Sequence, residues 1–143
     1  MIYDAESLFS DAQAITATAA STNVIDLGTP GTPQHAKGPI SQDLGRATAK
    51  PWRIQVVESF NNLTSLTVAV QVDDNEAFAS PKTVGSIVVP LANLVAGYVI
   101  PPEYIPAGTN ERYLRLYYTV TGTAPTAGAI TAGLVFGNEG WAV

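Results

Sequence analysis

The fold is decided by residues 112–121, RYLRLYYTVT, in which apolar side chains alternate with mainly polar ones. Successive side chains of an extended chain point to opposite faces, so a period of two is typical of a half-buried strand. One face carries four apolar side chains, Leu114, Leu116, Tyr118 and Val120. The other face carries Tyr113, Arg115, Tyr117 and Thr119. This stretch therefore predicts a strand with one face in a core.

The same alternation recurs in residues 64–72, TSLTVAVQV, with Leu66, Val68, Val70 and Val72 on one face. A shift of either strand by one residue would carry its apolar set to solvent, so the register of both is strongly specified. We expect one core built from Leu66, Val68, Val70, Leu114, Leu116, Tyr118 and Val120.

Shorter strands are expected around these two, because Val-, Ile- and Thr-containing runs alternate with clusters of Gly, Pro, Ser and Asn. They cover Gln13–Thr18, Asn23–Leu27, Trp52–Ser59, Val84–Val89 and Ala129–Phe136. Asp4–Phe9 and Pro90–Ala96 are candidates for short helical turns. The pattern predicts an all-β, single-domain jelly roll or β-sandwich over residues 1–143, with long loops.

Two segments have no apolar period and are predicted to be arms. The first, Gly28–Pro51, begins with Gly-Thr-Pro-Gly-Thr-Pro and continues as a polar stretch with further Gly and Pro. Loops of this length are uncommon in compact domains and are usually functional or mobile. The second is the tail at 137–143, whose Trp141 has no strand around it.

Composition excludes several classes of partner. The formal net charge is −5, with seven scattered Lys and Arg residues, which argues against a nucleic-acid partner because phosphate binding needs clustered cations. No apolar run approaches the ~20 residues that span a bilayer, and the N-terminus lacks the basic region of a signal peptide. There is no cysteine. We expect a soluble protein made in the cytoplasm, with no membrane partner.

Catalytic and metal sites are poorly supported. The single histidine, His35, lies in the polar arm with no second histidine to complete a zinc site. The acidic run Asp73–Glu76 lacks the Gly and distal Glu of an EF-hand loop and is better read as a solvated turn than as a calcium site. The sequence thus predicts no enzyme and no cofactor. Four aromatics are candidates for a sugar platform but fit a core or a subunit interface better: Trp52, Tyr98, Tyr104 and Trp141.

Three stretches carry a resemblance to a known family: Ser7–Gly28, Val57–Pro81 and Ala96–Val135. Their most specific parts are FSDAQ at 9–13, ERYLRL at 111–116 and TGTAPTAG at 121–128. Here the chain resembles the jelly-roll cement, or decoration, proteins of tailed bacteriophages. The resemblance implies a homotrimer that binds the major capsid protein on the exterior of the virion and stabilises the shell. A lectin-like, carbohydrate-binding module on a particle surface is the alternative.

The arm is the candidate capsid contact, because it is locally basic on an acidic chain. The arm contains three basic residues and one acidic residue, Asp43; the basic residues are Lys37, Arg46 and Lys50. Trp141 of the tail is a further candidate for capsid contact. The alternative is a passive connector. The candidate subunit interface is the strand face opposite the core, since Arg and Tyr are enriched in interfaces: Arg112, Tyr113, Arg115 and Tyr117. An ordinary solvated sheet face explains these four residues equally well.

Overall fold

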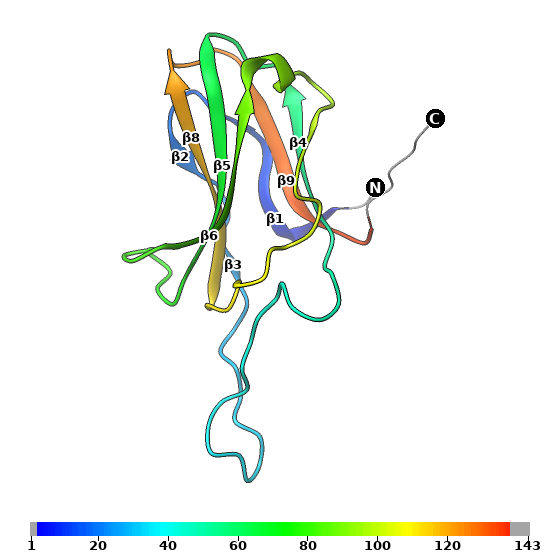
Figure 1. The fold of residues 1–143 in the computed structure, drawn as a ribbon, viewed down its shortest axis with the longest axis vertical. Coiled ribbons are helices and arrows are strands. Elements are labelled where there is room, and N and C mark those ends of the chain that lie inside the picture. The colour runs from blue at the N-terminus through cyan, green and yellow to red at the C-terminus, as the bar shows by residue number, and fades with distance from the viewer. Residues whose placement is uncertain (1–2, 138–143) are drawn as a thin grey trace.

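The structure, a computed structural model, describes residues 3–137 and consists of two antiparallel sheets packed face to face (Figure 1). The first sheet has the order β1-β9-β4-β7, with bounds Tyr3–Ala14, Ala129–Val135, Trp52–Glu58 and Val99–Ile100. The second has the order β2-β8-β5-β6, with bounds Ala19–Ala20, Tyr113–Gly122, Leu63–Asp73 and Lys82–Pro90. Strand β3, Ile25–Asp26, also pairs with β8. This is the predicted all-β sandwich. Within residues 3–137 no helix has the length and apolarity that a membrane crossing needs.

The two alternating stretches form the centre of the second sheet, as predicted. Strands β5 and β8 pair along their lengths, with Val68 opposite Tyr118 and Val70 opposite Leu116. Six of the seven predicted core residues are buried, namely Leu66, Val68, Val70, Leu114, Leu116 and Tyr118. Val120 is only partly buried and packs against this core.

The first sheet supplies the other half of the core. Phe9 of β1 and Trp52 of β4 are fully buried and meet edge to face, with their ring centroids 6.0 Å apart. A buried polar contact also joins the two sheets, because Ser10 Oγ of β1 lies 2.8 Å from the hydroxyl of Tyr118 in β8. The core is therefore a two-sided apolar layer with a buried polar contact across it.

Several local expectations differ from the structure in type or in length. Asp4–Phe9, the expected helical turn, belongs to β1, because pairing with β9 supplies hydrogen bonds that a single helical turn does not. The strand expected over Gln13–Thr18 ends at Ala14, and residues 16–18 bend where the chain crosses from one sheet to the other. Asn23–Leu27 is reduced to the two residues of β3, and Pro90–Ala96 to a 3-10 turn, η1, at Leu91–Asn93.

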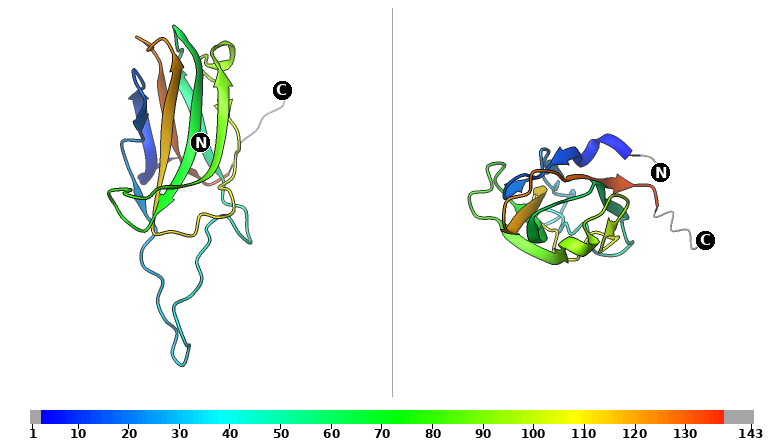
Figure 2. Two further views of the ribbon diagram at one scale, coloured as in Figure 1. Left: turned by 60° about the vertical axis from the view of Figure 1, so that its left-hand side comes forward. Right: turned by 90° about the horizontal axis from the view of Figure 1, so that it is seen from above.

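The two ends of the sandwich differ. A long loop, residues 28–51, leaves β3 and returns to β4, and it extends well beyond the sheets at one end (Figures 1 and 2). The opposite end is closed by four short connections, at 15–18, 59–62, 91–98 and 123–128, which contain no charged residue. The predicted arm is thus the largest feature outside the sandwich.

Candidate functional site

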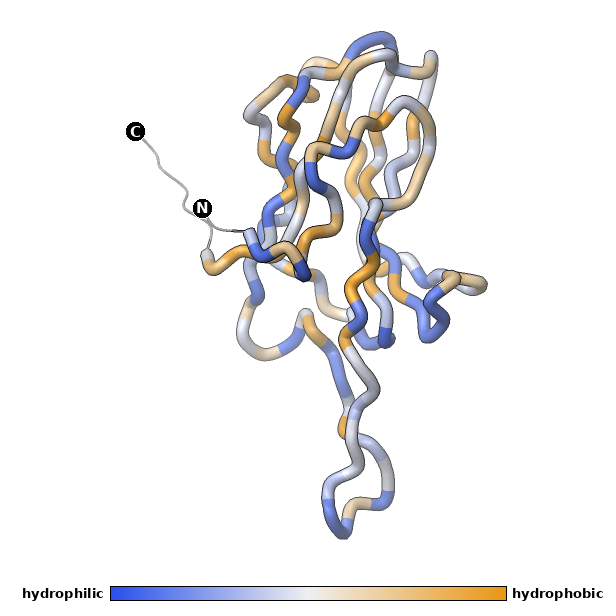
Figure 3. Tube along the Cα trace, turned by 180° about the vertical axis from the view of Figure 1, so that it is seen from behind, coloured by the Kyte–Doolittle hydropathy of each residue, from blue (hydrophilic) through white to orange (hydrophobic). Residues whose placement is uncertain are grey.

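The arm is a closed, projecting loop. Its outgoing limb starts at Gly28, whose positive φ of 78° suits glycine and whose N–H donates to Asp26 Oδ1 at 2.8 Å. Further out, the N–H of Ile40 donates to the carbonyl of Gly31 at 3.0 Å and joins the two limbs. Residues 32–39 therefore form the distal loop. It is mostly hydrophilic to neutral in Figure 3, although Ile40 at its base is 57% exposed.

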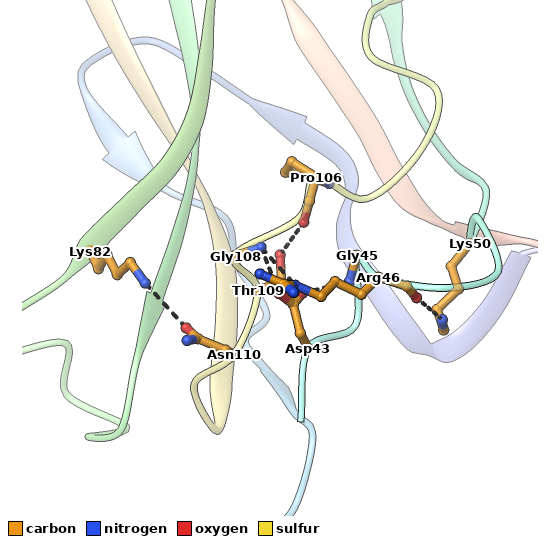
Figure 4. A network of polar contacts seen from close by, with 9 residues as sticks. All are labelled: Asp43, Gly45, Arg46, Lys50, Lys82, Pro106, Gly108, Thr109 and Asn110. Carbon is orange, nitrogen blue, oxygen red and sulfur yellow. Dashed lines mark hydrogen bonds and ion pairs between the residues drawn. The ribbon is translucent and has the colours of Figure 1, made fainter. Parts of the chain in front are cut away.

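The returning limb is fixed to the sandwich by the carboxylate of Asp43 (Figure 4). Asp43 accepts the N–H of Gly108 at 3.0 and 3.2 Å through its two oxygens, and that of Gly45 at 3.0 Å. Arg46 Nε donates to it at 3.1 Å. Loss of water contact opposes ionisation, but the Gly108, Gly45 and Arg46 donors outweigh it and lower the pKa of Asp43. The anchor is therefore charged at neutral pH.

Backbone contacts make the anchor tight. The N–H of Leu44 donates to the carbonyl of Thr109 at 2.9 Å, and the buried Thr109 hydroxyl donates to the carbonyl of Pro106 at 2.8 Å. A Cβ at Gly45 would overlap the carbonyl of Pro106, so only glycine fits there. Sequence reasoning did not identify this anchor, although Asp-Leu-Gly is a local sign of an Asx turn.

The four predicted contact residues do not form one cluster. Lys37 lies in the distal loop and is exposed. Arg46 is at the anchor, paired with Asp43, and its side chain is 78% exposed. The Nζ of Lys50 donates within the arm, to the carbonyls of Thr48 and Arg46 at 3.0 and 3.5 Å. Trp141 lies outside the described residues.

Three of the four predicted interface residues, Tyr113, Arg115 and Tyr117, lie on the outer face of the second sheet, whereas Arg112 lies in the bend just before β8. Arg112 makes two 2.8 Å contacts to Asp26 on β3, and this guanidinium, with the N–H of Gly28, lowers the pKa of Asp26 to about 2. The guanidinium of Arg115 lies 4.0 Å from the ring centre of Phe78 and 5.4 Å from that of Tyr117. Burial lowers the pKa of Arg115. Both arginines thus contact their own chain, and Tyr113 and Tyr117 remain half-exposed.

The acidic run is a structured turn. Both oxygens of Asp73 accept backbone N–H groups, from Asn75 at 3.0 Å and from Ser80 at 2.9 Å, and the Asn75 bond does most to lower its pKa. No group of three or more acidic or histidine side chains among residues 3–137 is placed to hold a metal ion. His35 is exposed in the distal loop of the arm.

One of the four aromatic residues considered for a sugar platform lies in the core. Trp52 is fully buried, and its Nε1–H donates to the carbonyl of Pro102 at 2.6 Å. Tyr98 is half-buried and Tyr104 is 48% exposed. Of the four candidate aromatics, Tyr98 and Tyr104 are thus the two that remain at the surface within residues 3–137.

Comparison with known proteins gives one family. The family model named Bbp16 matches residues 9–134, which is most of the chain, so the chain belongs to the Bbp16 family, whose name associates it with bacteriophages. No curated protein is significantly similar to the chain. The matched range includes the whole arm and its anchor.

Proposed function

We propose that this member of the Bbp16 family is a cement protein, which binds the outer surface of a phage capsid as a homotrimer and stabilises the shell. Its partner is the major capsid protein, and its place is the exterior of the virion, after synthesis in the host cytoplasm. The phage-associated family, the β-sandwich fold and the resemblance carried by FSDAQ, ERYLRL and TGTAPTAG support this function.

The observation that carries the proposal is the arm. None of residues 28–51 is fully buried, and Leu44 is the one hydrophobic residue among them that packs against the sandwich core, so the loop contributes little to core packing. The chain nevertheless fixes the loop in place through Asp43 and Leu44. An anchored loop of this length that contributes little to the core fits a role in binding a partner outside the chain.

The charge of the arm and its three copies in a trimer account for how it would bind the shell. Lys37 presents a positive charge from the distal loop of an otherwise acidic chain, which suits an acidic patch on the shell. Three arms on one trimer make each later contact intramolecular, so avidity rises without a strong single site. Exposed charge pairs are screened over about 8–10 Å near physiological salt, so binding should weaken as salt is raised.

The test removes the distal loop and keeps the anchor. Replacing residues 32–39 by Asn-Gly joins the limbs at Gly31 and Ile40 by a tight turn and leaves Asp43 in place. We expect this variant to fold and to bind shells stripped of the protein at least tenfold more weakly than the wild type. As a point test, Lys37→Glu should weaken binding severalfold at low salt. Lys37→Arg, which keeps the positive charge at the same position, is its control and should bind as the wild type does.

Three results would contradict the proposal. If the variant without residues 32–39 binds with full affinity, the arm is only a connector and does not bind the shell. A wild-type protein that ignores stripped shells but changes its tryptophan or tyrosine fluorescence with sugars would be a carbohydrate-binding module. Light scattering at micromolar concentration should give three times the chain mass of 15.0 kDa, and a monomer would refute the trimer.

A further inference from the structure

Strand β6 is the long, regular edge of the sandwich. It ends its sheet and pairs with β5 on one side only. The other edges are protected: β2 and β7 have two residues each, and β1 carries three register shifts together with the exposed acids Asp4, Glu6 and Asp11. Irregular pairing, short length and charge are the usual means by which edge strands avoid unwanted pairing.

Most of β6 lacks these protections. Its one register shift falls near its start, between the pairs of Val70 and Gln71, and Gly85–Pro90 then pairs regularly with β5. No charged residue follows Lys82 in the strand. Val88 is 62% exposed, so the outer face of this segment is apolar at that position. The segment Gly85–Val89 therefore offers an uncharged backbone template to another strand.

A groove lies beside this edge. It has a volume of about 130 Å³ and is lined by Ile54, Val70, Ile87, Pro101, Pro102 and Pro106, among others, none of them charged. It lies where β6 faces the proline-rich segment 101–106, and prolines have no N–H with which to pair a strand. An added strand would find backbone partners on β6 and apolar contacts in the groove.

We infer that β6 and this groove receive an extended, uncharged segment of the capsid subunit, which adds a strand to the second sheet. Side chains of such a strand alternate, so one set enters the groove and the other lies beside Val88. A charged side chain in the groove would lose water without meeting an opposite charge. The occupant thus has apolar residues at every second position.

This inference rests on the proposed function and deepens it, since it names a second contact besides the arm. The other candidate to cover β6 is a second copy of this chain. Pairing of β6 with its own copy is a two-fold contact, however, and a two-fold contact does not close a trimer. The proposed assembly thus excludes β6–β6 pairing, and pairing of β6 with another strand of a neighbouring protomer would show as protection of this edge in the free trimer.

Two variants test the site in different ways. Val88→Lys puts a charge on the edge, and Gly85→Leu fills the groove. A Cβ at Gly85 would meet only the Pro106 side chain, at the ordinary contact distances of 3.7 and 3.9 Å, so a side chain can begin there without a clash. Val57→Lys, on the inner strand β4 at a site 43% exposed, is the matched control. We expect the first two variants to bind stripped shells at least tenfold more weakly, and the control to bind as the wild type does.

Hydrogen exchange on decorated shells provides the second readout. The amides within Gly85–Val89 that point away from β5 should exchange at least tenfold more slowly on the shell than in the free trimer. Unchanged binding by both variants, or unchanged exchange, would overturn the inference and leave the cement function standing. Protection that appears in the free protein and grows with its concentration would assign the edge to a second copy instead. Failure of the wild type to bind shells at all would overturn the cement function itself.

Discussion

Removing the hydroxyls of Ser10 and Tyr118, which link the two sheets, should lower the free energy of unfolding by unequal amounts. The directions of their hydrogen bonds predict which loss is larger. Gln13 Oε1 has no hydrogen, so Ser10 must donate to it across their 2.7 Å contact. The hydroxyl of Ser10 has one hydrogen, and Tyr118 must therefore be the donor in the 2.8 Å contact between Tyr118 and Ser10. Tyr118 and Ser10 are both fully buried.

The two single substitutions then differ in what they leave behind. Tyr118→Phe removes one neutral hydrogen bond and leaves Ser10 donating to Gln13, at a cost of about 1 kcal/mol in the free energy of unfolding. Ser10→Ala removes the bond to Gln13 and also leaves the Tyr118 hydroxyl buried without a partner, so its cost is about 2–3 kcal/mol. The double variant has no unpaired tyrosine hydroxyl and should cost no more than Ser10→Ala alone.

Urea unfolding at one fixed protomer concentration, with extrapolation to water, measures these costs. The double-mutant cycle should depart from additivity by about 1–2 kcal/mol. Additive costs, or a larger loss for Tyr118→Phe than for Ser10→Ala, would refute the donor assignment.

The same tyrosine gives stability a dependence on pH. Burial raises the pKa of Tyr118 well above its ordinary value of 10.0, while the bond to Ser10 opposes the shift only in part. Above about pH 10 the unfolded chain loses a proton that the native chain keeps, so stability should fall as the pH rises. Tyr118→Phe should make this fall shallower. It should not abolish it, because burial also raises the pKa of Tyr3.

Two further predictions concern the core and the arm. Leu116→Ala empties a fully buried site in β8 and should lower the free energy of unfolding by about 2–5 kcal/mol in the same urea assay. A loss below about 1 kcal/mol would contradict the tight packing of Leu116 in the core. Asp43→Ala should let the amides of Gly45 and Gly108 exchange faster without unfolding the sheets. In the wild type these amides should stay protected as the pH falls, until the pH passes below the ordinary aspartate range, because the pKa of Asp43 is lowered. Loss of this protection already near pH 5 would contradict the anchor.

Sequence alone predicts the centre of the fold because its signal is local. Leu114, Leu116 and Tyr118 alternate over enough residues to specify both the strand and its buried face. Val120 has the same spacing but is only partly buried, since it lies two residues from the end of β8. The two-residue strands β2 and β7 are too short to show any period.

The parts that sequence missed depend on contacts between distant residues. Nothing around Asp4–Phe9 reveals its pairing with β9, more than 100 residues away, and that pairing overrides any helical tendency. The arm was predicted as a segment, because Gly28–Pro51 has no apolar period. Its anchor was not, because the contact of Asp43 with Gly108 spans 65 residues. The groove at β6 likewise depends on how segment 101–106 folds back along the sandwich.

The attachment of the arm determines how the molecule bears a mechanical load. Both limbs continue into strands that run along the long axis of the sandwich (Figure 1). The outgoing limb is held along β8 by the pairing of Ile25 with Leu114 and by the bond from Leu27 N–H to the carbonyl of Arg112. The returning limb enters β4, which has β9 and β7 on its two sides. A pull on the arm therefore acts parallel to these strands and shears their hydrogen bonds together, instead of peeling them apart one at a time. Tension that reaches the arm from outside is thus shared by both sheets.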